Sequence, residues 1–144
     1  MIKIIVAAHC GLASELVDAT MAISGKQPNL YFVALGLNDN LEQMRLRILN
    51  LLRDVSDKDG VLVLADMFGG TPCNASIRAC ADLKVTDLKF EVISGVNLPM
   101  ILSAVMLSKT DINLSELANK VLINGQKSIV NIKKVLEESS MSII

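Results

Sequence analysis

The chain has 144 residues, of which 51% are hydrophobic and 20% charged, and its formal net charge is −1. This length predicts a single domain spanning 1–144, and the hydrophobic content excludes a disordered chain. Aromatic residues are only 3% of the chain and neither sign of charge dominates, so we expect no nucleic-acid partner.

Four short apolar runs predict the strands of a sheet. They are rich in Val, Ile and Leu, and most lack the alternation with polar residues that marks a half-exposed strand. Such runs are typical of strands covered on both faces, as in a parallel sheet. The runs span 2–8, 30–35, 61–65 and 90–94.

Helical patterns lie between these runs, because apolar residues recur there in steps of three and four. Asn97 and Pro99 mark the start of a further helix after the fourth run. The alternation predicts an α/β fold, doubly wound, with a mainly parallel sheet of four strands and helices on both faces. The helical patterns cover 12–21, 41–55, 75–83 and 100–107.

The C-terminal part follows a different pattern. Residues 114–123 predict a helix that ends near Gly125. The β-branched residues Ile129, Val130 and Ile132 then favour a short fifth strand over the start of a terminal helix.

The three cysteines, Cys10, Cys73 and Cys80, match neither a zinc-binding spacing nor a disulfide framework. We expect a reducing compartment, the cytoplasm, and no metal site. Cys73 and Cys80 are predicted to be small core residues. Cys10 adjoins His9, but successive strand residues point to opposite faces, which argues against a Cys–His pair. No apolar run approaches the roughly 20 residues of a transmembrane helix.

In open α/β sheets ligands bind beyond the carboxyl ends of the strands. His9, the only histidine, directly follows the first run, and Asp66 directly follows the third. A carboxylate that accepts the Nδ1 proton of an imidazole leaves Nε2 as the nucleophile. The two residues are therefore a candidate catalytic pair, although a loop histidine and a helix-capping aspartate are the simpler alternatives.

The loop after Asp66 predicts an anion site. Gly69 and Gly70 allow close approach of the backbone, and Thr71 as N-cap with Pro72 as the first helical residue would start a helix. Free amides at a helix start favour a phosphate. The loop lacks the Gly-Lys-Ser/Thr of a P-loop, and it follows the wrong strand for a dinucleotide fingerprint.

Three segments together resemble the IIA component of the mannose-family (mannose/fructose/sorbose) bacterial phosphotransferase system. They are the His9 junction, the string Asp-Met-Phe-Gly-Gly-Thr-Pro-Cys-Asn at 66–74, and Gly-Val-Asn-Leu-Pro-Met at 95–100. The similarity extends over essentially the whole chain in the same order. One departure is Cys10, which stands where family members often have a glycine after the histidine.

The resemblance implies a phosphoryl carrier. His9 would take the phosphoryl group from the phosphocarrier HPr and pass it to a separate IIB component. Asp66 would orient His9, and Phe68, Gly69, Gly70 and Thr71 would receive the phosphoryl oxygens, without cofactor or metal. It also implies a cytoplasmic homodimer that exchanges its C-terminal strand, near 129–132, and that the IIC/IID permease recruits to the inner face of the membrane.

Other functions share this pattern. A phosphorylation-dependent regulatory module would carry the same histidine but bind a transcription factor or kinase, and it is usually embedded in a longer chain. The phosphoryl-donor subunit of a dihydroxyacetone kinase would share fold and histidine, but the string at 95–100 argues against it. A flavodoxin-like cofactor binder would need a hydroxyl-rich phosphate loop after the first strand, which is missing.

Overall fold

The computed structural model describes residues 1–83 and 87–139, and it contains one parallel sheet. The strands are β1 (Lys3–His9), β2 (Leu30–Leu35), β3 (Val61–Ala65) and β4 (Phe90–Ser94), in the order β2-β1-β3-β4. All three pairings are parallel. The four apolar runs therefore identify the strands to within one residue.

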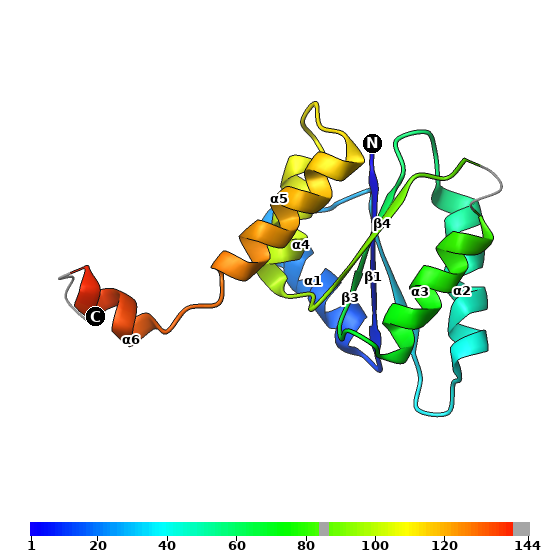
Figure 1. The fold of residues 1–144 in the computed structure, drawn as a ribbon, viewed down its shortest axis with the longest axis horizontal. Coiled ribbons are helices and arrows are strands. Elements are labelled where there is room, and N and C mark those ends of the chain that lie inside the picture. Colours follow the sequence, from blue (N-terminus) through cyan, green and yellow to red (C-terminus); the bar gives the residue numbers. More distant parts are fainter. Residues whose placement is uncertain (84–86, 140–144) are drawn as a thin grey trace.

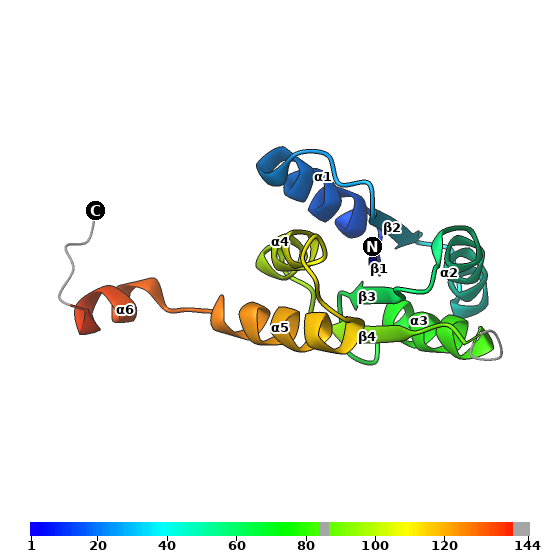
Figure 2. The same ribbon diagram turned by 90° about the horizontal axis from the view of Figure 1, so that it is seen from above.

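Helices cover both faces of this sheet (Figures 1 and 2). On one face lie α1 (Leu12–Ser24), α4 (Leu98–Leu107) and α5 (Leu114–Lys127), and on the other lie α2 (Leu41–Val55) and α3 (Thr71–Asp82). The doubly wound α/β architecture predicted from the sequence is confirmed.

Two aliphatic clusters, one on each face of the sheet, form the core. Alternate residues of β1 enter opposite clusters, with Ile4 and Val6 on the α1 side and Ile5 and Ala7 on the α2 side. Strands buried on both faces need apolar residues at every position, which explains why β1 and β3 show no alternation with polar residues. In the described residues, no helix combines the length and the hydropathy needed to cross a membrane.

In the C-terminal part of the chain, two predictions from the sequence differ from the structure. Helix α5 continues past Gly125 to Lys127, because Gly125 is buried against Met100 of α4 and does not terminate the helix. The predicted fifth strand at 129–132 is absent. Residues 129–131 lack regular structure and α6 (Ile132–Glu138) follows, so the alternative of a terminal helix was the right one.

The physical reason is that β-branched residues form a strand only when a neighbouring strand pairs with them. Here α6 lies apart from the sheet at the end of an extended linker (Figure 1), and none of its residues is buried.

Candidate active site

The two residues predicted to form a pair lie side by side at the carboxyl edge of the sheet. His9 is the last residue of β1 and Asp66 follows β3, its neighbour in the sheet. The chain leaves β1 toward β2 on one side and leaves β3 toward β4 on the other. His9 and Asp66 therefore occupy the point where the strand order reverses, the usual position of a site in this architecture.

One oxygen of Asp66 holds His9 in two ways. Its Oδ2 lies 2.7 Å from Nδ1 of the imidazole and accepts the backbone N–H of His9 at 2.9 Å. Because a carboxylate oxygen only accepts, Nδ1 carries the proton and Nε2 presents its lone pair. The Asp66 side chain is 10% exposed and that of His9 is 42% exposed. The pair thus combines a largely covered carboxylate with an imidazole that another molecule can reach.

The loop after Asp66 forms a tight turn that leads into α3. Gly69 has a φ of +76°, a left-handed conformation that favours glycine. The N–H of Gly70 donates to the carbonyl of Met67 at 3.1 Å and closes the turn. The side chain of Asn74 in the first turn of α3 also donates to the carbonyl of Gly69, at 3.2 Å.

Helix α3 begins one residue earlier than predicted. The carbonyl of Gly70 accepts the N–H of Asn74, so Gly70 is the N-cap and Thr71 is the first helical residue. The hydroxyl of Thr71 makes no capping bond, and Pro72 moves to the second helical position. The Thr71 hydroxyl is therefore not engaged as a cap and remains a candidate donor to a ligand.

The start of α3 lies directly beside the imidazole. A Cβ placed on Gly70 would be 3.3 Å from Cε1 of His9. Within the described parts of the chain, the amides of Thr71 and Cys73 have no hydrogen-bond acceptor. Amides at the positive end of a helix dipole are suited to bind an anion, and these two follow Gly70, which lies beside the imidazole.

Exposed apolar side chains follow the strands β1, β2 and β3 at the same edge of the sheet as His9. Leu12, Met67 and Phe68 are all exposed, Phe68 to 86%. The structure adds Leu37, which is 92% exposed in the loop after β2. Its position after a predicted strand was the signal that could have identified it.

The loop that carries Leu37 is braced by an ion pair. Asp39 accepts the N–H of Gly36 at 2.6 Å and pairs with Arg47 of α2. The hydrogen bond from Arg47 holds the pKa of the Asp39 carboxyl below its usual range, with a further contribution from the Gly36 amide. The bracing carboxylate is therefore ionised near neutral pH, and Leu37 projects from a fixed loop.

The cysteines do not form a second reactive group with His9. Cys10 is exposed, with a φ of +51°, and its N–H donates to Leu35 of β2. Cys73 and Cys80 are buried, as predicted. Burial raises the pKa of the Cys80 thiol to about 12, which keeps this thiol protonated.

Residues 95–100 begin at the same edge of the sheet as His9, but their contacts are with helices α4 and α5. Asn97 is the N-cap of α4, and its Oδ1 accepts the N–H of Met100 at 3.0 Å. Its Nδ2 donates to the carbonyl of Gly125 in α5 at 3.4 Å. These contacts join α4 to α5 and involve neither His9 nor Asp66.

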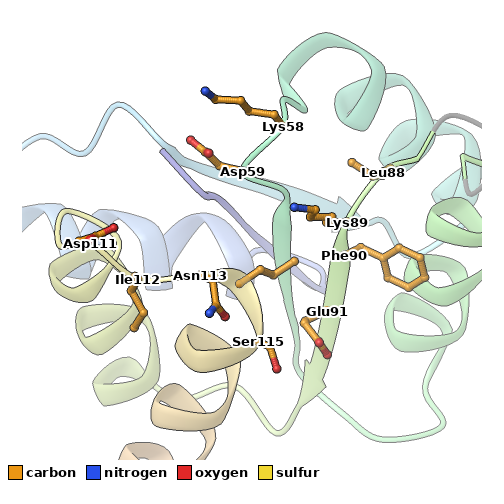
Figure 3. A pocket seen from close by; sticks show the side chains of 11 residues that line it. Lys58, Asp59, Leu88, Lys89, Phe90, Glu91, Asp111, Ile112, Asn113 and Ser115 are labelled. Carbon is orange, nitrogen blue, oxygen red and sulfur yellow. The ribbon is translucent and has the colours of Figure 1, made fainter.

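A pocket lies at the opposite edge of the sheet, near the amino ends of β3 and β4 (Figure 3). It has a volume of about 660 Å³, and its lining includes Lys58, Lys89, Glu91 and Ser115. Charges of both signs line it, and none of the candidate site residues does. His9 and Asp66 therefore lie outside this pocket, at the carboxyl edge of the sheet.

Known proteins resemble this chain over most of its length. A family model described as the PTS system fructose IIA component matches residues 3–122. The PTS system fructose-specific EIIA component of Bacillus subtilis is 28% identical over 138 residues, covering 96% of this chain and 91% of that protein. The mannose-specific EIIAB component of Escherichia coli K12 is 28% identical over 132 residues, covering 92% of this chain and 40% of that protein.

The fold also matches solved structures. The phosphotransferase system component EIIA from Streptococcus agalactiae superposes with a TM-score of 0.81 at 30% identity, covering 93% of this chain and 99% of that one. The similarity in sequence and the similarity in fold therefore point to the same group of proteins.

Proposed function

The chain belongs to the fructose IIA component family of the sugar phosphotransferase system, the mannose-type IIA family, and we propose that within this system it carries a phosphoryl group on His9. The donor is phospho-HPr and the acceptor is a IIB component, which serves the IIC/IID permease. The observation that carries the proposal is the His9–Asp66 pair beside the start of α3.

The transfer uses the two nitrogens of His9 differently. The Nε2 lone pair forms the new N–P bond while the P–N bond of the donor breaks, and its electron pair returns to the donor imidazole. The Nδ1 proton stays in its 2.7 Å contact with Asp66, which stabilises the positive charge that develops on the ring. Transfer to IIB reverses these bond changes.

The loop Phe68–Thr71 binds the phosphoryl oxygens in this proposal. A phosphoryl group carries close to two negative charges near neutral pH. The amide of Thr71 and its hydroxyl supply neutral donors, and residues 66–74 contain no lysine or arginine. Neutral donors hold the group less strongly than a cation would, which suits a group that must move on.

HPr and IIB dock in turn on the apolar rim of Leu12, Leu37, Met67 and Phe68. In-line transfer between two imidazoles requires the partner surface to close around His9, because water at the phosphorus would hydrolyse the phosphohistidine. Exposed apolar side chains on a braced loop and a tight turn offer such a surface. We place this protein in the cytoplasm, at the inner face of the membrane when the permease binds it.

We further propose a homodimer. β4 is an edge strand of the sheet, and Ile129 and Val130 are 78% and 55% exposed beyond α5. Exposed apolar β-branched residues that pair with no strand among the described residues are suited to cover the free edge of β4 in a second copy.

The test is phosphorylation of the purified chain with phosphoenolpyruvate, enzyme I and HPr, followed by intact-mass measurement. The wild type should gain a single phosphoryl group, which leaves when IIB is added, and His9→Ala should gain none. A His9→Gln variant with an unchanged circular dichroism spectrum controls for folding. A phosphoryl group that remains on His9→Ala would refute the proposal.

A further inference from the structure

The backbone conformation of Gly70 does not require a glycine. Its φ of −74° and ψ of 165° are an extended conformation that any residue adopts, unlike the left-handed Gly69 before it. The requirement for glycine at position 70 must therefore come from the space around its Cα.

That space is occupied by His9. A Cβ on Gly70 would lie 3.3 Å from Cε1 of the imidazole, 3.2 Å from the carbonyl oxygen of Met67 and 3.4 Å from its Cε. Ordinary van der Waals contacts of a Cβ lie at 3.4–4 Å, so two of these neighbours would have to move. The Met67 carbonyl accepts the N–H of Gly70 in the turn, which leaves the imidazole as the group with more freedom to shift.

The imidazole is thus held from two sides. Asp66 holds Nδ1 by a hydrogen bond, and the bare Cα of Gly70 lies against Cε1. Cε1 is bonded to both ring nitrogens, so a displacement of Cε1 also displaces Nε2. The amides of Thr71 and Cys73, which have no acceptor among the described residues, follow Gly70 directly in the chain.

We propose that Gly70 is a positioning residue. By carrying no side chain, it lets the imidazole lie against the start of α3, so that Nε2 and the amides of α3 bind the same phosphoryl group. This inference rests on the proposed function of His9 and adds a residue that acts through the ring. A displacement of about 1 Å can lower a rate by about 10²-fold. The imidazole of Gly70→Ala should move by only a fraction of 1 Å, so the rate should fall by less than this factor.

The test compares Gly70→Ala with Gly11→Ala. Gly11 lies at the same edge of the sheet, has a φ of −82°, and has nothing within 4 Å of its added Cβ. Transfer rates are measured from saturating phospho-HPr and from phosphoramidate, a small donor that needs no docking. Gly70→Ala should slow both reactions by about 10-fold with an unchanged KM for HPr, whereas Gly11→Ala should stay within about twofold of wild type.

Two spectroscopic measurements separate positioning from folding. The imidazole ¹⁵N shifts of His9 should change in Gly70→Ala and not in Gly11→Ala. In the wild type, a strong nuclear Overhauser effect should join Hε1 of His9 to the Hα protons of Gly70, which tests the contact even if Gly70→Ala does not fold.

Wild-type rates in Gly70→Ala, a loss confined to HPr, or an absent Overhauser effect would each overturn the inference. Phosphorylation of His9→Ala would instead overturn the proposed function, so the two failures are distinguishable.

Discussion

At the scale of single residues, the two carboxylate oxygens of Asp66 have different surroundings. Oδ2 makes both contacts with His9, while Oδ1 is buried and has no hydrogen-bond partner among the described residues. A buried oxygen without a partner lowers stability by about 1–3 kcal/mol. This arrangement disfavours folding locally, so we interpret Asp66 as a residue retained for the chemistry of His9.

Asp66→Ala should therefore stay folded but transfer slowly. Without the carboxylate, Nδ1 loses the acceptor that selects its tautomer and the charge that stabilises the phosphorylated ring. We expect the transfer rate from HPr to fall by roughly 10²–10⁴-fold, by analogy with the orienting carboxylate of hydrolase triads. Stopped-flow kinetics on the folded variant would measure it.

The matched control is Asp66→Asn, which keeps the shape of the side chain and removes its charge. It should lose most of the same rate, because a neutral amide does not stabilise an imidazolium. A rate within about threefold of wild type in Asp66→Ala, under about 1 kcal/mol of barrier, would remove Asp66 from the site.

At the scale of elements, the 95–100 turn connects α4 to α5. Asn97 caps α4 and also binds the carbonyl of Gly125, which accepts the Ser128 hydroxyl as well, at 2.6 Å. The absence of a side chain at Gly125 lets Met100 pack against α5. This turn therefore fixes the end of α5, from which the C-terminal segment leaves the fold.

Gly125→Ala should destabilise the protein although alanine favours helices. The gain in helix propensity is about 1 kcal/mol. The new Cβ, however, would collide with Cγ of Met100 and lie 2.8 Å from its Sδ, and overpacking of this kind costs about 1–3 kcal/mol. Urea unfolding should therefore show a net loss of up to about 2 kcal/mol.

A double-mutant cycle with Met100→Ala identifies the cause. The two substitutions should couple favourably, since removal of the Met100 side chain frees the space that the methyl group added by Gly125→Ala needs. Additive effects, or a Gly125→Ala variant more stable than wild type, would show that the α4–α5 contact is loose.

At the scale of the whole molecule, the C-terminal segment is the part that the isolated chain leaves unpacked. Helix α6 has seven residues, none of them buried, and Figure 2 shows it beyond the two helical layers. A helix this short is unstable in water without packing partners. Its order in solution therefore requires a surface outside its own chain.

The proposed dimer should become a monomer when Ile129→Lys is combined with Val130→Lys. Charged side chains cannot be buried against the β4 edge of a second copy without a large desolvation cost. Sedimentation equilibrium would measure the mass of each species. Ile23→Lys, at an exposed apolar position near the end of α1, is the control and should leave the dimer intact. A doubly substituted chain that remains dimeric would contradict the proposed interface.

The sequence alone determined the four strands, the helices between them and the pairing of His9 with Asp66. The strands follow from apolar runs and the helices from residues spaced by three and four, which are local properties of the chain. His9 and Asp66 could be paired from their positions in the sequence because parallel strands bring their carboxyl ends to one edge.

Only the tertiary structure decided which residues pack closely against one another and which remain exposed. The contact of Gly70 with the imidazole, the burial of Gly125 against Met100 and the exposure of Leu37 depend on packing between segments that are far apart in sequence. The segment 129–132 shows the same limit, because β-branched residues predict a strand while a strand needs a neighbour to pair with. Local spacing carries no information about that neighbour, and the isolated chain does not supply one.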